Sequence, residues 1–328
     1  MLITSASNEK LKNIKKLSKS SKERNEQSLF IVEGIRMFRE IPPEEIESVY
    51  VSETGAVKFE DELKAALGKD YQSRDDYYVV SDRVFSGVSD TGTPQGILAL
   101  VRQKVNNLSI VLNEKCEKSE KPEKVEKSEK VEKSEKPEKV EKSEKSEKIE
   151  KSEKLEKTEK IEKSYEVLSL EDNGLDASDN AFILIIEKLQ DPGNLGTIIR
   201  TAEGAGVTGI IISSDSVDIY NPKVVRSTMG SIFRMPVYVS DDLIRDIECL
   251  KKKGITVYGA HLKGQNIYDK NFKASCAFLI GNEGNGLSEE VSKTAEELIK
   301  IPMKGKVESL NAAISTAVIA YEVLRQRM

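Results

Sequence analysis

The sequence predicts an α/β protein with two globular parts, and three observations lead to that fold class. Short apolar segments alternate with helix-like segments in the first third of the chain. The middle of the chain is a charged repeat that carries no core-forming pattern. Strand-like and helix-like segments then alternate again in the βαβα order of a parallel sheet covered on both faces.

Composition narrows the possible chemistry. The chain has 328 residues and a net charge of −5, and its only histidine is His261. Its cysteines, Cys116, Cys249 and Cys276, lack metal-type spacing. A zinc site, a Ser-His-Asp triad or a Cys-His pair would need residues that this chain hardly has. We therefore expect no metal, and chemistry carried by carboxylates, amides, hydroxyls, arginines or a cofactor.

The first segment, residues 1–27, is predicted to form a basic helix. Its residues 8–26 carry six lysines and one arginine against three glutamates, and Leu11, Ile14 and Leu17 recur at helical spacing. Two interpretations stay open. The segment is either an ordinary surface helix or an arm that contacts phosphates, and the second applies only if other observations implicate RNA.

A small α/β domain is predicted for residues 28–105. Its short apolar runs are typical of strands, and helix-like stretches lie between them. The predicted strands are Leu29–Val32, Ser48–Val51, Tyr77–Val80 and Ile97–Val101.

A linker is predicted for residues 106–180. From Glu114 to Lys163 the chain repeats the triplet X-Glu-Lys, and a three-residue period keeps no apolar stripe on a helix. Glu at i does meet Lys at i+4, which favours a solvated helix, but Pro122 and Pro137 interrupt it. We expect a mobile or partly helical spacer without a catalytic role.

The last part, residues 181–328, is predicted to form a parallel sheet with helices on both faces. The predicted strands are Ala181–Glu187, Gly209–Ser213, Arg234–Val239, Ile255–His261, Ala274–Ile280 and Glu297–Ile301. The predicted helices are Leu195–Ala205, Asp241–Lys253, Ser288–Ala295 and Ser309–Gln326.

Three loops at the carboxyl ends of these strands are unusual as simple turns, and ligands of open α/β sheets gather there. In the first loop Asp191-Pro-Gly predicts a turn, Asn194 is a predicted N-cap, and Arg200 follows six residues later. In the second, Gly281-Asn-Glu283-Gly-Asn-Gly286 follows a buried strand, and its glycines would let backbone N–H groups approach a ligand.

The third loop runs from Ile301 to Ser315. Ser309 is the predicted cap of a long apolar helix. Asn311 would then lie inside the first turn of that helix, where asparagine is a poor helix former and needs another reason to be present.

One glycine motif is misleading. Gly204-Ala-Gly206-Val-Thr-Gly209 matches the dinucleotide-binding pattern of an oxidoreductase, but that motif must follow a strand and open a helix. Here it closes a helix and precedes a strand. Gly204 or Gly206 is therefore predicted to be a helix C-cap.

Taken in order, the segments DPGNLGTIIRTAEGAG, IGNEGNGLS and IPMKGKVESLNAAISTAVIAYE resemble the three motifs of the SpoU (TrmH-like) branch of the SPOUT RNA methyltransferases. Phe30-Ile-Val-Glu-Gly34-Ile-Arg36 and Thr91-Gly-Thr-Pro94-Gln-Gly96 resemble the substrate-binding domain that precedes many such enzymes, a ribosomal-protein L30e-like domain.

This resemblance implies a trefoil knot in the sheet, a homodimer with active sites near the subunit interface, and S-adenosyl-L-methionine as the cofactor. The residues implied to bind the cofactor are Gly281, Asn282, Gly284, Ile301, Met303, Leu310 and Ala313. The residues implied to line the reaction centre are Asn194, Arg200, Glu283, Ser309 and Asn311.

The chemistry expected from the resemblance is methyl transfer to a ribose 2′-hydroxyl. Arg200 is the candidate for activating that hydroxyl, either as a base or as an electrostatic activator. An arginine is a poor proton acceptor, so we prefer the second role, in which it binds the adjacent phosphate and stabilises developing oxyanion charge. His261 is interpreted as a structural residue rather than part of the cofactor pocket.

The expected function is thus methylation of ribosomal RNA in the cytoplasm. A tRNA methyltransferase and a non-catalytic RNA-binding protein on the same scaffold are the alternatives. The intact Asn194, Arg200, Glu283 and Asn311 argue against the non-catalytic alternative.

Overall fold

The structure, a computed structural model of the chain, describes residues 2–104, 107–112 and 180–328. The Glu-Lys repeat with Cys116, and with it most of the predicted linker, lies outside the described residues. No helix within the described ranges has the length and apolarity needed to cross a membrane.

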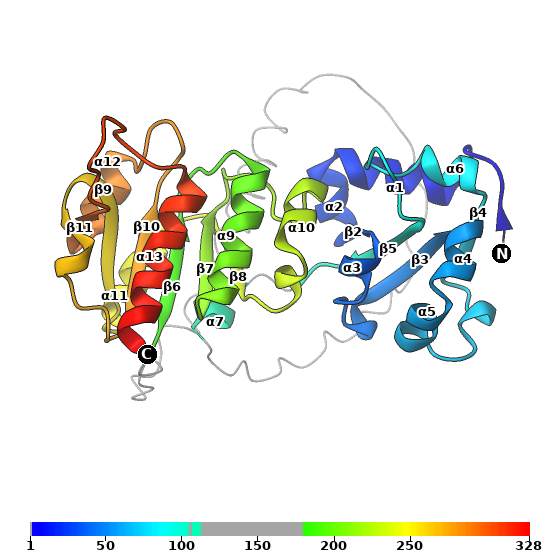
Figure 1. Cartoon of the computed structure of the whole chain (residues 1–328), viewed down its shortest axis with the longest axis horizontal. Helices are drawn as coiled ribbons and strands as arrows, with labels where there is room; N and C mark the ends of the chain where they lie inside the picture. The colour runs from blue at the N-terminus through cyan, green and yellow to red at the C-terminus, as the bar shows by residue number, and fades with distance from the viewer. Residues whose placement is uncertain (1, 105–106, 113–179) are drawn as a thin grey trace, which may run out of the picture. The chain divides into compact units, whose positions relative to one another are not determined.

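The N-terminal domain is built on a five-stranded mixed sheet of order β1-β4-β3-β5-β2 (Figure 1). In this sheet β4 pairs in parallel with β1 and β3, whereas β5 runs antiparallel to β3 and β2. The four predicted strands are confirmed. A fifth strand, β1, was not predicted because it is too short to show an alternation of apolar and polar residues. The bounds are β1 Leu2–Ile3, β2 Leu29–Glu33, β3 Ile46–Ser52, β4 Tyr77–Val80 and β5 Ile97–Arg102.

Helices cover both faces of this sheet. The predicted N-terminal helix exists as α1, and its Leu11, Ile14 and Leu17 are buried against Ile31 and Leu98 of the sheet. It is therefore part of the N-terminal domain rather than a separate segment. The helices are α1 Glu9–Lys19, α2 Ser21–Gln27, α3 Ile35–Phe38, α4 Glu53–Lys58, α5 Glu60–Leu67 and α6 Asp82–Ser86.

A short helix, α7 (Leu108–Val111), lies within the predicted linker but packs on the C-terminal sheet. Val111 is buried in the same cluster as Ile183 and Ile211. A Cβ atom on Gly209 would lie 2.5 Å from the Val111 side chain, so the glycine leaves room for α7 to pack on the sheet. These linker residues therefore belong to the C-terminal core.

The C-terminal domain contains the predicted parallel sheet, with six strands in the order β11-β9-β10-β6-β7-β8 and every pair parallel. Both faces are buried, as shown by β6, where Leu184 and Ile186 face one core cluster and Ile183 and Ile185 face another. The bounds are β6 Phe182–Ile186, β7 Gly209–Ser213, β8 Val237–Ser240, β9 Thr256–Asn266, β10 Cys276–Ile280 and β11 Glu297–Lys300.

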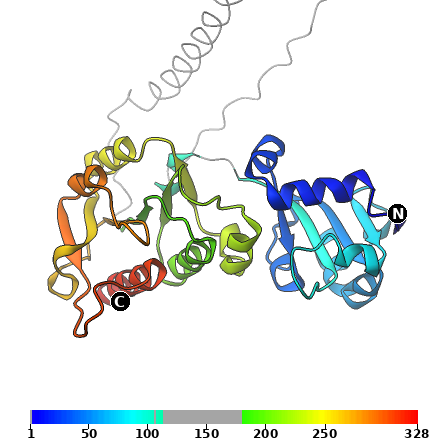
Figure 2. The same cartoon turned by 90° about the horizontal axis from the view of Figure 1, so that it is seen from above.

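Helices α9 and α13 cover one face of this sheet, and α7, α11 and α12 cover the other (Figures 1 and 2). The sequence did not predict α10, and β8 begins later than predicted because residues 231–233 form a 3₁₀ turn before Pro236. The helices are α9 Pro192–Gly204, α10 Pro222–Thr228, α11 Leu243–Lys252, α12 Glu289–Thr294 and α13 Ala312–Arg327.

The misleading glycine motif forms the end of α9. Gly206 has φ +74°, and its N–H donates to Glu203 O while Val207 N–H donates to Ala202 O. This is the left-handed helix termination that favours glycine. The prediction that Gly204 or Gly206 is the C-cap is wrong by one residue, because Ala205 is the C-cap and Gly206 follows it in the left-handed conformation, and β7 begins only at Gly209.

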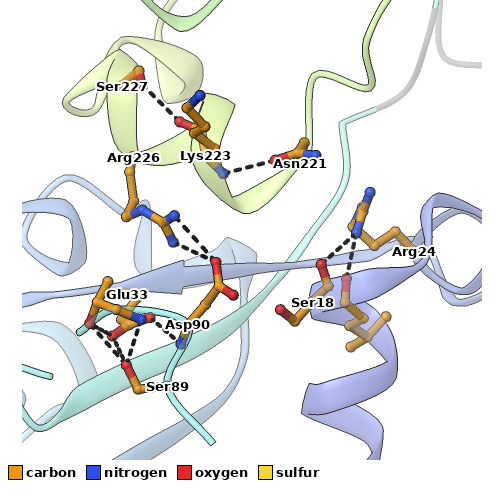
Figure 3. A network of polar contacts seen from close by, with 11 residues as sticks. Ser18, Arg24, Glu33, Ser89, Asp90, Asn221, Lys223, Arg226 and Ser227 are labelled. Carbon is orange, nitrogen blue, oxygen red and sulfur yellow. Dashed lines mark hydrogen bonds and ion pairs between the residues drawn. The ribbon is translucent and has the colours of Figure 1, made fainter. Parts of the chain in front are cut away.

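Side chains of α2 and α10 connect the two domains. Arg24, which is buried, donates to Asp218 Oδ2 from Nε at 2.8 Å and from Nη2 at 2.6 Å, and also to Leu17 O. Figure 3 shows a second contact, in which Arg226 of α10 donates to Asp90 Oδ2 at 3.2 Å from Nη1. These contacts place the end of α1 next to the C-terminal domain.

Candidate active site

The three loops singled out in the sequence meet at the carboxyl ends of β6 and β10. These two strands are neighbours in register, with Ile280 opposite Ile186, so the chain leaves the sheet at the same level in both. Asn194, Glu283 and Asn311 form one hydrogen-bonded group there, which we call the amide–carboxylate cluster. The cluster joins Asn194 to Glu283, which lies 89 positions later in the sequence, and to Asn311, which lies 117 positions later.

Glu283 is the acceptor at the centre of the cluster. Its Oε1 accepts from Asn194 Nδ2 at 3.1 Å and from Asp191 N at 3.1 Å, and its Oε2 accepts from Gln190 N at 3.3 Å. Partial burial raises the pKa of Glu283, but the hydrogen bonds from Asn194, Asp191 and Gln190 outweigh it, so that the pKa lies below the ordinary range. Glu283 is therefore an ionised acceptor that orients its donors, and it is not poised to transfer protons.

Asn194 is held between Glu283 and Asn311. It donates to the carboxylate through Nδ2, and its Oδ1 accepts from Asn311 Nδ2 at 3.0 Å. The predicted N-cap role of Asn194 is wrong, because Asp191 caps α9 by accepting from Asn194 N at 2.8 Å. Since the cap is one turn earlier, the Asn194 side chain is free to join the cluster.

Asn311 is the N-cap of α13, so the prediction that Ser309 caps this helix is wrong. Asn311 Oδ1 accepts from Ala313 N at 2.9 Å and from Ile314 N at 3.3 Å. The helix begins at Ala312, and asparagine is a favoured residue at the cap position just before a helix. The cap fixes Oδ1 and leaves Nδ2 to donate to Asn194, which is the reason for an asparagine at this position.

Arg200 lies outside the cluster. It follows Asn194 by six residues, which turns its side chain by about 120° around α9 relative to Asn194. The side chain is exposed, and within the described ranges it forms no hydrogen bond or ion pair. A single chain thus brings Asn194, Glu283 and Asn311 together but leaves Arg200 apart from them.

A cavity of about 280 Å³ lies beside the cluster, between the second and third loops and β9. This volume is near the lower end of the ~300–1,000 Å³ typical of ligand pockets. Both apolar and polar residues line the cavity. Of the residues predicted to bind a cofactor or to line the reaction centre, those that line the cavity are Gly281, Asn282, Glu283, Gly284, Ile301, Met303, Ser309 and Leu310.

Other predicted residues are not in the cavity wall. Ala313 does not line it, whereas its neighbours Ala312 and Ser315 do. The interpretation of His261 as a purely structural residue is wrong, because His261 lines the cavity together with Ala260 and Leu262. Its Nδ1 accepts from Lys263 N at 3.1 Å.

The contribution of β9 has a structural cause. Gly259 pairs with Leu298 of β11, but the next pair is Gln265 with Ile299, so residues 260–264 bulge out of the ladder. A bulge redirects side chains at the edge of a site. The predicted strand ended at His261, whereas β9 continues to Asn266, so most of the bulge lies beyond the residues predicted as strand.

Backbone N–H groups of the glycine-rich loop, predicted to approach a ligand, form hydrogen bonds within the loop. Asn282 and Gly286 exchange both backbone hydrogen bonds at 3.0 Å, and Asn282 Oδ1 accepts from Gly284 N at 2.8 Å. The N–H of Gly284 is thus used within the loop. A Cβ atom on Gly281 would lie 2.1 Å from Gly286 C, so glycine is required at 281 for the chain to fold back on itself.

The first loop contains a residue in a strained backbone conformation. Lys188 has φ +52°, which non-glycine residues adopt at a cost. Lys188 O accepts from Asn282 Nδ2 at 2.8 Å and from Gln190 Nε2 at 3.2 Å, which ties the first loop to the second. The side chain is half-exposed, and its Nζ lies 3.9 Å from Glu187 and Asp215.

The described residues contain no group of three or more His, Cys, Asp or Glu side chains that would hold a metal ion. The arrangement consists of an ionised carboxylate that orients two amides, next to a cavity lined by both apolar and polar residues. Such a site binds and positions groups, and the cavity suits an organic ligand with a flat apolar part.

Comparison with known proteins identifies the type of site. Residues 181–321 match the SpoU rRNA methylase family, and residues 8–99 match the MRM3-like substrate-binding domain. A solved rRNA methyltransferase from Sinorhizobium meliloti, with AdoMet bound, superposes with a TM-score of 0.69 at 23% identity, covering 99% of this chain and 97% of that one. The fold is therefore that of a SPOUT methyltransferase.

Two similar proteins show the family of this chain more directly than the solved structure does. The chain is 34% identical over 168 residues to the putative TrmH family tRNA/rRNA methyltransferase YacO of Bacillus subtilis, covering 50% of this chain and 68% of the relative. It is 28% identical over 322 residues, 98% of each chain, to the 23S rRNA (guanosine(2553)-2′-O)-methyltransferase RlmP of the same organism.

The chain belongs to the SpoU (TrmH) family of RNA methyltransferases, as its three motifs indicated. Some relatives match only the C-terminal part. Against the 23S rRNA (guanosine-2′-O-)-methyltransferase RlmB of Xanthomonas campestris, for example, the chain spans 61% of the relative's length.

Proposed function

We propose that this chain transfers a methyl group from S-adenosyl-L-methionine to a ribose 2′-hydroxyl in ribosomal RNA. The observation that carries the proposal is the intact amide–carboxylate cluster of Asn194, Glu283 and Asn311 beside the cavity. A scaffold that had lost its catalytic role would have no need to keep three polar side chains in one connected network.

The cavity fits the proposed cofactor. The apolar part of its lining suits an adenine ring. When bound, S-adenosyl-L-methionine supplies an electrophilic methyl group. The residues that would hold it are Gly281, Asn282, Gly284, Ile301, Met303 and Leu310, with Ala312 in place of Ala313 at the cavity wall.

The ribose would be held by the cluster and by Arg200. The hydroxyl must lose a proton as it attacks, and Glu283 is engaged as an acceptor of four hydrogen bonds, with a pKa below the ordinary range. We assign to Arg200 the binding of the adjacent phosphate and the stabilisation of developing oxyanion charge. Ser309, in the cavity wall, would complete the reaction centre.

Ribosomal RNA is favoured over tRNA as the substrate. The relative that aligns over 98% of both chains, including the N-terminal domain, is a 23S rRNA methyltransferase by name. The N-terminal domain would bind that RNA as an L30e-like module, and the proposed substrate implies a cytoplasmic location. The trefoil knot implied by the resemblance is part of the same proposal.

A homodimer is supported by the outer face of α13. Ile314, Val318 and Tyr321 follow one another at helical spacing, and Ile314 and Tyr321 are 53% and 52% exposed. The opposite face of α13 is buried in the core of the C-terminal domain, so the helix is apolar on both sides, and a helix of this kind is normally buried. A second copy on this face would lie near α9, which carries Arg200.

The experiment that tests the function is mass-spectrometric mapping of 2′-O-methylated nucleotides in ribosomal RNA from cells with and without this chain. One site of ribose methylation should disappear and return on complementation. Calorimetric titration with S-adenosyl-L-methionine gives the second readout. No binding of the cofactor and no lost methyl group would leave a non-catalytic RNA-binding protein.

A further inference from the structure

The outer face of α1 carries a row of lysines that neither the core nor the candidate active site uses. Lys12, Lys15, Lys16 and Lys19 are all exposed. At 3.6 residues per turn they fall within an arc of about 100°, opposite the buried Leu11, Ile14 and Leu17. We call these four residues the lysine row.

Most of the lysine row has no counter-charge in the chain. Lys12 pairs with Glu9 at 2.7 Å, whereas Lys15, Lys16 and Lys19 form no hydrogen bond or ion pair with any described residue. Like charges at i,i+4, here Lys12 with Lys16 and Lys15 with Lys19, destabilise a helix by roughly 0.2–0.5 kcal/mol per pair. The helix dipole offsets this for Lys16 and Lys19 in the last turn but not for Lys12 and Lys15.

The lysine row does not simply reflect a high lysine and arginine content over acidic residues, because the whole chain has a net charge of −5. A concentrated positive row on an acidic chain attracts a polyanion. A membrane surface fits poorly, since interfacial helices need apolar side chains beside their basic ones, and the apolar side chains of α1 are buried in the core.

Contacts connect α1 to the candidate active site. Arg24, just after α1, binds the Leu17 carbonyl and Asp218, and Asp218 lies in the loop that leads into α10. From α10, Lys223 reaches Asp191 at 3.9 Å, and the N–H of Asp191 donates to Glu283. Figure 3 shows two separate parts of this path, the contact of Arg24 with Ser18 and that of Lys223 with Asn221.

We propose that the lysine row binds the phosphodiester backbone of the RNA substrate outside the reaction centre, and so holds the RNA while the target ribose enters the amide–carboxylate cluster. This inference rests on the proposed function. The row contacts phosphates and carries no sequence information, so it contributes affinity and register rather than choice of nucleotide.

The test uses the full chain with all four lysines replaced: Lys12→Gln, Lys15→Gln, Lys16→Gln and Lys19→Gln. Glutamine forms helices about as well as lysine. The matched control removes the same charge at exposed lysines elsewhere: Lys58→Gln, Lys69→Gln, Lys252→Gln and Lys273→Gln. The probe is ribosomal RNA from cells that lack this chain, with filter binding at several salt concentrations and transfer of labelled methyl groups.

The variant of the lysine row should bind this RNA at least tenfold more weakly at low salt. Its plot of log affinity against log salt should be shallower by about 3, since each phosphate contact contributes roughly 0.7–0.9 to that slope. The KM for RNA should rise with little change in kcat, because the row binds ground and transition states equally. Affinity for S-adenosyl-L-methionine should be unchanged, and the control variant should resemble the native chain.

The inference fails if the variant of the lysine row and the control bind RNA alike. It also fails if Lys→Arg replacement at the four positions, which keeps the charge, weakens binding as much as Lys→Gln. Acetylation of the native chain gives a readout without variants, because RNA should protect Lys15, Lys16 and Lys19 but not Lys69 or Lys252. If the native chain binds RNA but methylates none, the proposed function fails and the lysine row is judged by binding alone.

Discussion

The amide–carboxylate cluster and Arg200 belong to the same proposed reaction centre, yet hydrogen bonds within a single chain hold only the cluster in place. Glu283 accepts four hydrogen bonds and Asn311 is fixed by its role as a helix cap, so the cluster is organised before any ligand arrives. Arg200 is exposed and forms no hydrogen bond or ion pair with the described residues. The difference indicates that the cluster is built by folding, whereas Arg200 acquires its partner from RNA or from a second copy.

The strongest test of this comparison is Arg200→Ala. Loss of a group that stabilises developing charge should lower kcat by about 10²–10³-fold. Affinity for S-adenosyl-L-methionine and thermal stability should be unchanged, because Arg200 contacts neither the cavity nor the core. Single-turnover methyl transfer and calorimetry measure the two effects. Arg83→Ala, at an exposed arginine of α6, is the matched control, and unchanged turnover of Arg200→Ala would remove it from the mechanism.

Gly281→Ala tests the cavity separately. The added Cβ would lie 2.1 Å from Gly286 C and 2.2 Å from Leu287 N, so the backbone of the second loop must move. We expect S-adenosyl-L-methionine to bind on the order of 10²-fold more weakly, equivalent to about 2.7 kcal/mol.

The control for this change is Gly305→Ala in the third loop, since a Cβ atom there would have nothing within 4 Å and Gly305 does not line the cavity. Its cofactor affinity should stay close to that of the native chain. Equal affinity in the two variants, measured by calorimetry on protein of native circular dichroism, would contradict the position of the pocket.

Glu283→Gln should weaken the hydrogen bonds of the amide–carboxylate cluster without removing a side chain from it. A glutamine keeps one oxygen and replaces the other with an NH₂ donor, so it can no longer accept from both the Asp191 N–H and the Gln190 N–H. We expect kcat to fall about tenfold to 10²-fold because Asn194 loses its orientation. Native-like turnover in this variant would contradict the role assigned to the cluster.

The same residue predicts a pH dependence. The pKa of Glu283 lies below its ordinary value, so its stabilising contribution is present above that ordinary value, ~4.3, and is lost only as the pH falls through the depressed pKa. The pH–rate profile of the native chain should therefore show no acid limb from this group between about pH 5 and pH 8. A limb near pH 6 that Glu283→Gln abolishes would show that the pKa is raised instead.

The smallest expected effect comes from Lys188→Gly. Lys188 has φ +52°, which glycine adopts without a steric cost, so the change should stabilise the chain by about 0.5–1 kcal/mol. Thermal unfolding measures it. Ser28→Gly, at φ 53° and outside the site, should give a similar gain with unchanged activity. If Lys188→Gly destabilises the chain, its side-chain contacts outweigh the backbone strain.

The sequence by itself identified β2 to β5 of the N-terminal sheet, the six strands of the C-terminal sheet and the glycine that follows the end of α9. These features depend on local properties, namely apolar periodicity and the preferences of glycine, proline and cap residues. Gly206, with φ +74°, is one of the two glycines that the sequence placed at the end of this helix.

Only the tertiary structure decided which residues touch. It showed that Asp191 and Asn311 are the caps, that residues 260–264 bulge to bring His261 to the cavity, and that Arg200 stands apart from Asn194. Asn194 meets Glu283 and Asn311 across 89 and 117 residues of chain. Such contacts follow from strand register and helix rotation, which no local pattern encodes.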